Sequence, residues 1–272
     1  MCIRDRLLAP NDEAYAASSH SDQIPSKEMT SILTSRLAYV LTGDNNIDAS
    51  AYDGLIHLTN ELRARTSYEP GDPIGLDLNK DDLSLYPLIY WPIYASMPQP
   101  NEKIIQKLAT FMRFGGTVIF DTRNSDVHSN VIGESQESLW LRLLLQKLDV
   151  PVLEKVPRDH VITKTYYLIN KIQGSSDPCD SWVEKTFIDV SDERRNNVIQ
   201  STHNVSSLII TSCNLASAWS RFSRENTFSI NQDAHNLELA MRSGINIVMY
   251  TLTGNYKSDQ VHKRRIIERL QK

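Results

Sequence analysis

Two charged residues follow a short apolar segment in the middle of the chain. Residues 117–120 are β-branched and aromatic, as a buried strand would be, and Asp121 and Arg123 come directly after them. Ligands of α/β proteins bind where parallel strands end, so an aspartate there can orient a ligand and an arginine can bind a carboxylate or phosphate. An ion pair between the two, or capping of the next helix, explains the pattern equally well. Asp121 and Arg123 are therefore candidate ligand-binding residues, and a small anionic molecule is the ligand they suggest.

Asp159 and His160 form a second polar pair. An aspartate beside a histidine can act as an acid–base unit. Neighbouring residues of an extended segment point to opposite faces, however, so a hydrogen bond that stabilises a loop is the simpler interpretation. His203, His235 and His262 show no metal-ligand spacing. We expect neither a metal nor a cofactor.

A parallel sheet would position these residues, and the chain has the pattern for one. Strands are predicted at residues 36–42, 85–92, 117–120 and 208–212. Helices are predicted from apolar stripes at residues 47–62, at residues 104–112, and at Leu139, Leu143, Leu144 and Leu148. This alternation is typical of an α/β domain with a mainly parallel central sheet covered on both faces.

Four boundaries follow from local signals. Asp48 or Ser50 is predicted to cap the first helix, and residues 70–73 to form a turn. Residues 115–116 are glycines and should end the second helix in a left-handed C-cap. Residues 237–252 have helical spacing, and this helix is predicted to end at residues 254–255.

The exit loops of three predicted strands are expected to line one rim. They are residues 43–45, 121–123 and 213–215, and they add Asp44 and Asn214 to the candidate ligand-binding residues. Strand carboxyl ends and helix amino ends meet at this edge, where N–H groups favour an anion. Arg123 is the one fixed positive charge in these loops, so an anion should bind beside it.

The composition narrows the class of protein. The chain has 272 residues, of which 40% are hydrophobic and 23% charged, as in ordinary globular proteins. A net charge of -4 gives no field that attracts nucleic acid. No apolar run approaches the ~18 residues that span a bilayer. Cys2, Cys179 and Cys213 are odd in number and lack paired spacing, so neither a disulfide framework nor a zinc knuckle is expected.

Two regions are predicted along the chain. Residues 1–35 are polar, small and aperiodic, which is typical of a disordered linker. Residues 1–6 look like a translated adapter remnant, in which case the natural chain begins further upstream. Residues 36–272 are predicted to form a single α/β domain, with residues 150–206 as an elaboration made of short strands and loops.

Several sequence segments resemble those of a known family. They are residues 37–44, 86–92, 115–123, 159–164 and the long ending at 244–262. In this order they resemble the bacterial domain-of-unknown-function family 4159, from about Arg36 to the C-terminus. That family is similar in fold to class I glutamine amidotransferases, so the resemblance implies a three-layer, flavodoxin-like domain.

The resemblance also raises a question of catalysis. Amidotransferases need a cysteine on a tight strand-to-helix turn, flanked by small residues. Cys213 is the candidate, but no glycine lies two residues to either side, and no histidine–glutamate pair is evident. We therefore expect Cys213 to be a buried free cysteine and not a nucleophile.

The resemblance implies a cellular context as well. Members similar to this chain tend to carry membrane-spanning segments of the aerotolerance-regulator (Bat) type before the soluble domain. This implies a domain tethered at the bacterial inner membrane, on the periplasmic side in preference to the cytoplasmic one. Its partner would be the upstream part of the same protein or another protein.

Two classes of function remain open. The first is a non-catalytic ligand-binding or protein-interaction domain, which we favour because no complete catalytic set is visible. The second is a hydrolase or transferase that uses the Asp121 and Arg123 edge. A pocket that holds Asp121, Arg123, Asp159 and His160 together would favour the second.

Overall fold

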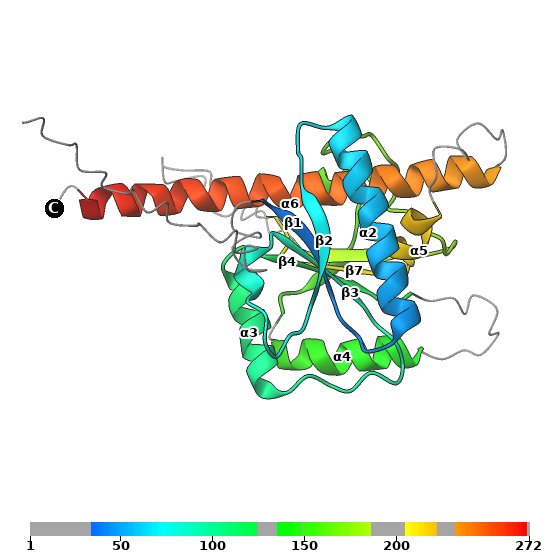
Figure 1. Cartoon of the computed structure of the whole chain (residues 1–272), viewed down its shortest axis with the longest axis horizontal. Helices are drawn as coiled ribbons and strands as arrows, with labels where there is room; N and C mark the ends of the chain where they lie inside the picture. The colour runs from blue at the N-terminus through cyan, green and yellow to red at the C-terminus, as the bar shows by residue number, and fades with distance from the viewer. Residues whose placement is uncertain (1–33, 124–134, 149, 186–204, 222–231, 271–272) are drawn as a thin grey trace, which may run out of the picture.

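A seven-stranded sheet forms the centre of the molecule (Figure 1). The structure is a computed structural model, and it describes residues 34–123, 135–148, 150–185, 205–221 and 232–270, with side chains of the last helix from residue 234 to 253. The strands are β1 (Arg36–Val40), β2 (Gly71–Leu76), β3 (Leu88–Pro92), β4 (Thr117–Asp121), β5 (Leu153–Lys155), β6 (Ser181–Glu184) and β7 (Leu208–Thr211). Their order is β2-β1-β3-β4-β7-β6-β5.

The first five strands of this order are parallel. Strand β6 runs antiparallel to β7, and β5 antiparallel to β6. The prediction of an α/β domain with a mainly parallel sheet is confirmed, and the four predicted strands are the parallel neighbours β1, β3, β4 and β7. The described part of residues 150–206 adds β5 and β6 to the edge of the same sheet.

Helices cover both faces of the sheet. They are α2 (Asn45–Arg65), α3 (Glu102–Arg113), α4 (Gln136–Leu148), α5 (Leu215–Ser220) and α6 (Gln232–Leu270), with short 3₁₀ helices η1 (Leu83–Leu85) and η2 (Val161–Thr163). Helices α2, α5 and α6 pack on one face, and α3 and α4 on the other (Figure 1). Strands β3, β4 and β7 are buried along their whole length, which is why they read as continuous apolar runs.

The first helix begins earlier than predicted. The Asp44 side chain accepts hydrogen bonds from the backbone N–H groups of Asn46 and Ile47, so Asp44 is the N-cap in place of Asp48 or Ser50. Asp48 instead accepts from the Thr42 backbone N–H at 2.8 Å. The apolar stripe begins only at Ile47, so a prediction based on it starts the helix later than Asn45. The left-handed end of α3 is confirmed, because Gly115 has a φ of 93°.

Two other predictions are wrong in instructive ways. Residues 70–73 were expected to be a turn, but Gly71–Leu76 is the edge strand β2, where Pro73 is tolerated. In α4 the expected stripe included Leu139 and Leu143, which are 45% and 53% exposed. Trp140 and Leu141 are buried in their place, because the packing of the helix against the sheet selected the neighbouring face.

Helix α6 does not end at residues 254–255 but continues to Leu270. A helical glycine lowers stability by only about 1 kcal/mol relative to alanine, so Gly254 is a weak stop signal. The predicted linker lies outside the described residues, apart from Thr34 and Ser35.

A group of charged residues fastens α6 to α2. Arg65 of α2 binds Glu238 of α6 with Nη1 and Nη2, at 2.8 and 3.1 Å. Arg242 binds the same carboxylate at 2.8 Å, and Glu61 binds Arg65 from within α2. Partial burial acts to raise the pKa of Glu238, but the hydrogen bonds and charges of Arg65 and Arg242 hold it below the ordinary value of 4.5.

This lowered pKa predicts acid-sensitive docking of α6. An acid whose folded-state pKa is depressed stabilises the fold above its ordinary pKa, and the contribution is lost as the pH falls through the folded-state value. We expect Glu238→Gln to reduce the free energy of unfolding by roughly 1–2 kcal/mol at pH 7, and the difference from the parent protein to shrink below pH 4. Urea unfolding of both proteins at pH 7 and at a pH below 4 measures this difference. The exposed Glu69→Gln, outside any helix, is the control, and equal losses for Glu238→Gln at both pH values would contradict the argument.

Candidate functional site

Asp121, the last residue of β4, is fully buried. One carboxylate oxygen accepts from the backbone N–H groups of Arg123 and Asn214, at 2.9 and 3.1 Å. The other accepts from the Tyr90 hydroxyl at 2.8 Å and the Leu215 N–H at 2.7 Å. Asp121 therefore ties the end of β4 to the centre of β3 and to the residues that follow β7.

Burial raises the pKa of Asp121, while its four hydrogen-bond donors act in the opposite direction. Burial and the adjacent carboxylate also raise the pKa of Tyr90 well above 10.0, so its hydroxyl remains a donor. All four neighbours donate, and a carboxylate accepts from each of them. The geometry thus gives Asp121 a structural role, and its oxygens do not face solvent.

The other exit-loop residues lie at the same edge of the sheet. Arg123 and Asn214 both have left-handed backbone conformations, with φ of 50° and 53°. Arg123 is half-buried and its Nε donates to the Ile93 carbonyl at 3.4 Å. The Thr42 carbonyl, just before Asp44, accepts from the hydroxyl of Tyr94 at 3.3 Å, which connects the exits of β1 and β3. The topology therefore places Asp44, Asp121, Arg123 and Asn214 on one rim.

Asp159 and His160 lie elsewhere. His160 caps η2, its Nδ1 accepting from the Ile162 N–H at 3.2 Å, and burial lowers its pKa. Its ring packs edge-on against Tyr250 of α6, with 5.7 Å between the centroids. The Tyr250 hydroxyl accepts from the N–H of Ser206, before the start of β7. His160 thus belongs to the amino-end side of the sheet, whereas Asp121 and Arg123 lie at the carboxyl end.

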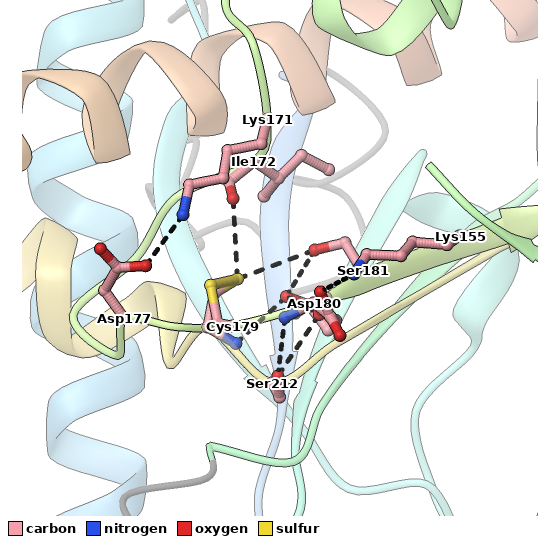
Figure 2. A network of polar contacts seen from close by, with 10 residues as sticks. Lys155, Lys171, Ile172, Asp177, Cys179, Asp180, Ser181 and Ser212 are labelled. Atoms are coloured by element: carbon pink, nitrogen blue, oxygen red, sulfur yellow. Dashed lines mark hydrogen bonds and ion pairs between the residues drawn. A yellow bond between two sulfur atoms is a disulfide. The ribbon is translucent and has the colours of Figure 1, made fainter. Parts of the chain in front are cut away.

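Cys179 and Cys213 are joined by a disulfide, with 5.0 Å between their Cα atoms (Figure 2). This corrects the expectation that Cys213 is a free cysteine and that no disulfide is present. The two residues are 34 positions apart, and no spacing rule signals a single bridge of this kind. Cys213 is fully buried two residues after the end of β7, and because it is disulfide-bonded it has no thiolate to act as a nucleophile.

A cavity of about 920 Å³ opens at the carboxyl edge, between α4 and the strands β5, β6 and β7. Its apolar wall includes Leu141 and Leu145 of α4, Trp182 of β6 and Ile210 of β7. Its polar lining includes Thr122 and Ser212 at the strand ends, Arg142 and Gln146 of α4, and Asp180. We call this cavity the carboxyl-edge pocket.

Sequence reasoning missed most of the carboxyl-edge pocket. Thr122 lines the pocket and lies between the predicted residues Asp121 and Arg123, so its position at a strand exit was the signal in the sequence that could have pointed to this site. The remaining wall comes from α4, β5 and β6, whose pairing with β7 is a long-range contact. Within the described ranges, no group of three or more histidine, cysteine, aspartate or glutamate side chains is arranged to hold a metal ion.

Residues 36–252 match the family described as Domain of unknown function (DUF4159). The chain belongs to this family. The DUF4159 match begins at β1 and ends in α6, so it includes every strand of the sheet and the carboxyl-edge pocket. No curated protein matches the chain.

Proposed function

We propose that this DUF4159 chain is a non-catalytic ligand-binding domain, and that its ligand occupies the carboxyl-edge pocket. The cavity of about 920 Å³ carries the proposal. Small-molecule sites usually enclose roughly 300–1,000 Å³ and combine an apolar lining with a few polar groups. They also favour the carboxyl ends of strands in α/β sheets.

The arrangement of polar residues supports binding over catalysis. Asp121 is enclosed by four donors, and Cys213 is held in the disulfide. His160 lies on the side of the sheet away from Arg123, so the four residues whose convergence would favour a hydrolase or transferase do not share a pocket.

The lining indicates the chemical class of the ligand. Leu145, Trp182 and Ile210 offer apolar surface, and Arg142 brings a positive charge to the rim. The carboxylate of Asp180 is already paired with Lys155. A molecule with an apolar body and an anionic group fits this combination.

The finer fold and the location are part of the same proposal. The five parallel strands lie in the order β2-β1-β3-β4-β7. If only the parallel strands are numbered along the chain, this is the order 2-1-3-4-5 of flavodoxin-like sheets, which supports the amidotransferase-like architecture. Disulfides persist in oxidising compartments, so the Cys179–Cys213 bridge supports a periplasmic location. The tether to the inner membrane is proposed from the family resemblance alone. In the part of the chain described here, no helix has the length and apolarity to cross a bilayer.

The dye 1-anilinonaphthalene-8-sulfonate has the proposed chemistry, an apolar body with one anionic group, and serves as the probe. We expect it to bind the folded protein, and Leu145→Glu to weaken binding at least tenfold by placing a negative charge in the apolar wall. Arg142→Gln should weaken it less, by roughly threefold to tenfold, because it removes the attraction to the sulfonate and leaves the apolar wall unchanged. Fluorescence titration measures both.

A second cavity provides the control. It has about 600 Å³ and lies at the opposite edge, lined by Phe114 of the α3 end and by Leu252. Phe114→Glu should leave dye binding unchanged if the carboxyl-edge pocket is the site. Loss of binding in Phe114→Glu, with none in Leu145→Glu, would move the site to that second cavity and overturn the proposal.

A further inference from the structure

The loop between residues 171 and 180 forms one wall of the carboxyl-edge pocket. Pro178, Cys179 and Asp180 are three consecutive lining residues. The loop reaches this place from η2 by running along α6, where the Gln173 N–H binds the Ser243 hydroxyl at 3.0 Å. It then enters β6 at Ser181, next to the end of β7. We call residues 171–180 the wall loop.

The wall loop has little apolar anchoring besides the disulfide. Ile172 at its start is buried, as is Ser181 just after it, but every side chain from residue 173 to residue 180 is half-buried or exposed. Cys179 is the member of this stretch that packs against the hydrophobic core. Its bond to the fully buried Cys213 therefore connects the wall loop to the core covalently (Figure 2).

The remaining connections are hydrogen bonds near the surface and an exposed ion pair between Asp180 and Lys155 of β5. The Ser176 N–H donates to the Cys213 carbonyl at 3.1 Å, and the Ser175 hydroxyl to the Asn214 carbonyl at 3.1 Å. The Ser212 N–H donates to the Asp180 carbonyl at 3.0 Å, and the Asp180 N–H donates to the Ser212 hydroxyl at 3.0 Å. Each such bond contributes roughly 1 kcal/mol net, and local opening is common where hydrogen bonds are exposed and apolar contacts few.

The two cysteines of the bridge differ in burial. Cys213 is fully buried, whereas Cys179 is half-buried and lines the carboxyl-edge pocket. Of the two cysteines, we therefore expect Cys179 to be the one that an incoming thiolate attacks. The Ser181 hydroxyl lies 3.7 Å from the Cys213 sulfur and can donate to the thiolate that leaves.

We propose that the Cys179–Cys213 disulfide is a redox latch that holds the wall loop and thereby controls ligand binding in the carboxyl-edge pocket. The reductant is a dithiol, such as that of a thiol–disulfide oxidoreductase. One of its thiolates attacks Cys179, forming a mixed disulfide and releasing Cys213 as a thiolate that takes up a proton. Its second thiol then displaces Cys179, so the dithiol is oxidised to a disulfide and the two cysteines gain two electrons and two protons. The ligand-affinity part of this inference rests on the proposed function.

Reduction of the folded protein with dithiothreitol, a dithiol, tests the latch without any ligand. Hydrogen exchange measured by mass spectrometry should show exchange in residues 173–180 at least tenfold faster after reduction, while residues 117–121 of β4 stay protected. The double variant Cys179→Ser/Cys213→Ser should show the fast exchange with and without reductant. Unchanged protection of the wall loop in the reduced protein would overturn the latch.

The dye titration then tests the coupling to binding. Reduction should weaken 1-anilinonaphthalene-8-sulfonate binding at least fivefold, and reoxidation should restore it. Faster exchange with unchanged affinity would overturn the control of binding. Failure of the oxidised protein to bind the dye would instead count against the proposed ligand site, and the exchange result would still decide whether the disulfide holds the loop.

Discussion

Asp121→Ala is expected to lower the free energy of unfolding by about 3–5 kcal/mol, the largest effect of any single substitution considered. The change removes the acceptor for the buried Tyr90 hydroxyl and Leu215 N–H and for the part-buried N–H groups of Arg123 and Asn214. Buried donors without an acceptor destabilise by roughly 1–3 kcal/mol each when nothing replaces the partner. Relaxation and water entry reduce the sum to the stated range.

Urea unfolding followed by tryptophan fluorescence measures this loss, and the melting temperature should fall by about 10 °C for a domain of this size. Asp44→Ala is the matched control, because it also removes a carboxylate from the rim. It uncaps α2 at the surface and should reduce stability by only about 1 kcal/mol. A loss for Asp121→Ala no larger than that of the control would show that the buried carboxylate does not hold the strand ends.

Gly54→Ala is expected to destabilise the protein by roughly 2 kcal/mol, although alanine is the better helix former by about 1 kcal/mol. Gly54 lies on the buried face of α2, against α5. A Cβ atom there would lie 2.4 Å from the carbonyl oxygen of Ala216 and 2.8 Å from its Cα. These are backbone atoms, so no side-chain rotation relieves the overlap and the two helices must separate.

Two variants separate the contact from helix propensity. Ala49→Gly, at an exposed position of the same helix, measures the propensity difference alone. Ala216→Gly added to Gly54→Ala should not restore stability, because the close atoms belong to the backbone. A stabilised Gly54→Ala protein, or rescue by Ala216→Gly, would contradict the close approach of α2 and α5.

The sequence by itself determined the parts of this protein whose physical signal is local. Residues 36–42, 88–91, 117–120 and 208–212 were identifiable as central strands because strands buried on both faces must be apolar throughout. The stripes of α2 and α3 were identifiable because a helix buries every third or fourth residue. From these, the parallel topology placed Asp44, Asp121, Arg123 and Asn214 at one edge.

Only the tertiary structure decided the roles of these residues. The sequence around Asp121 is the same whether its side chain faces a ligand or is enclosed by Tyr90, Asn214 and Leu215, because these three donors lie in distant parts of the chain. Packing against the sheet decided which face of α4 is buried, and pairing with β1 made residues 71–76 the edge strand β2. Cys179 and Cys213 meet because β6 returns antiparallel beside β7, and the carboxyl-edge pocket exists because of the same pairing. Contacts between distant segments form only when the whole chain folds, and for that reason no local pattern of residues predicts them.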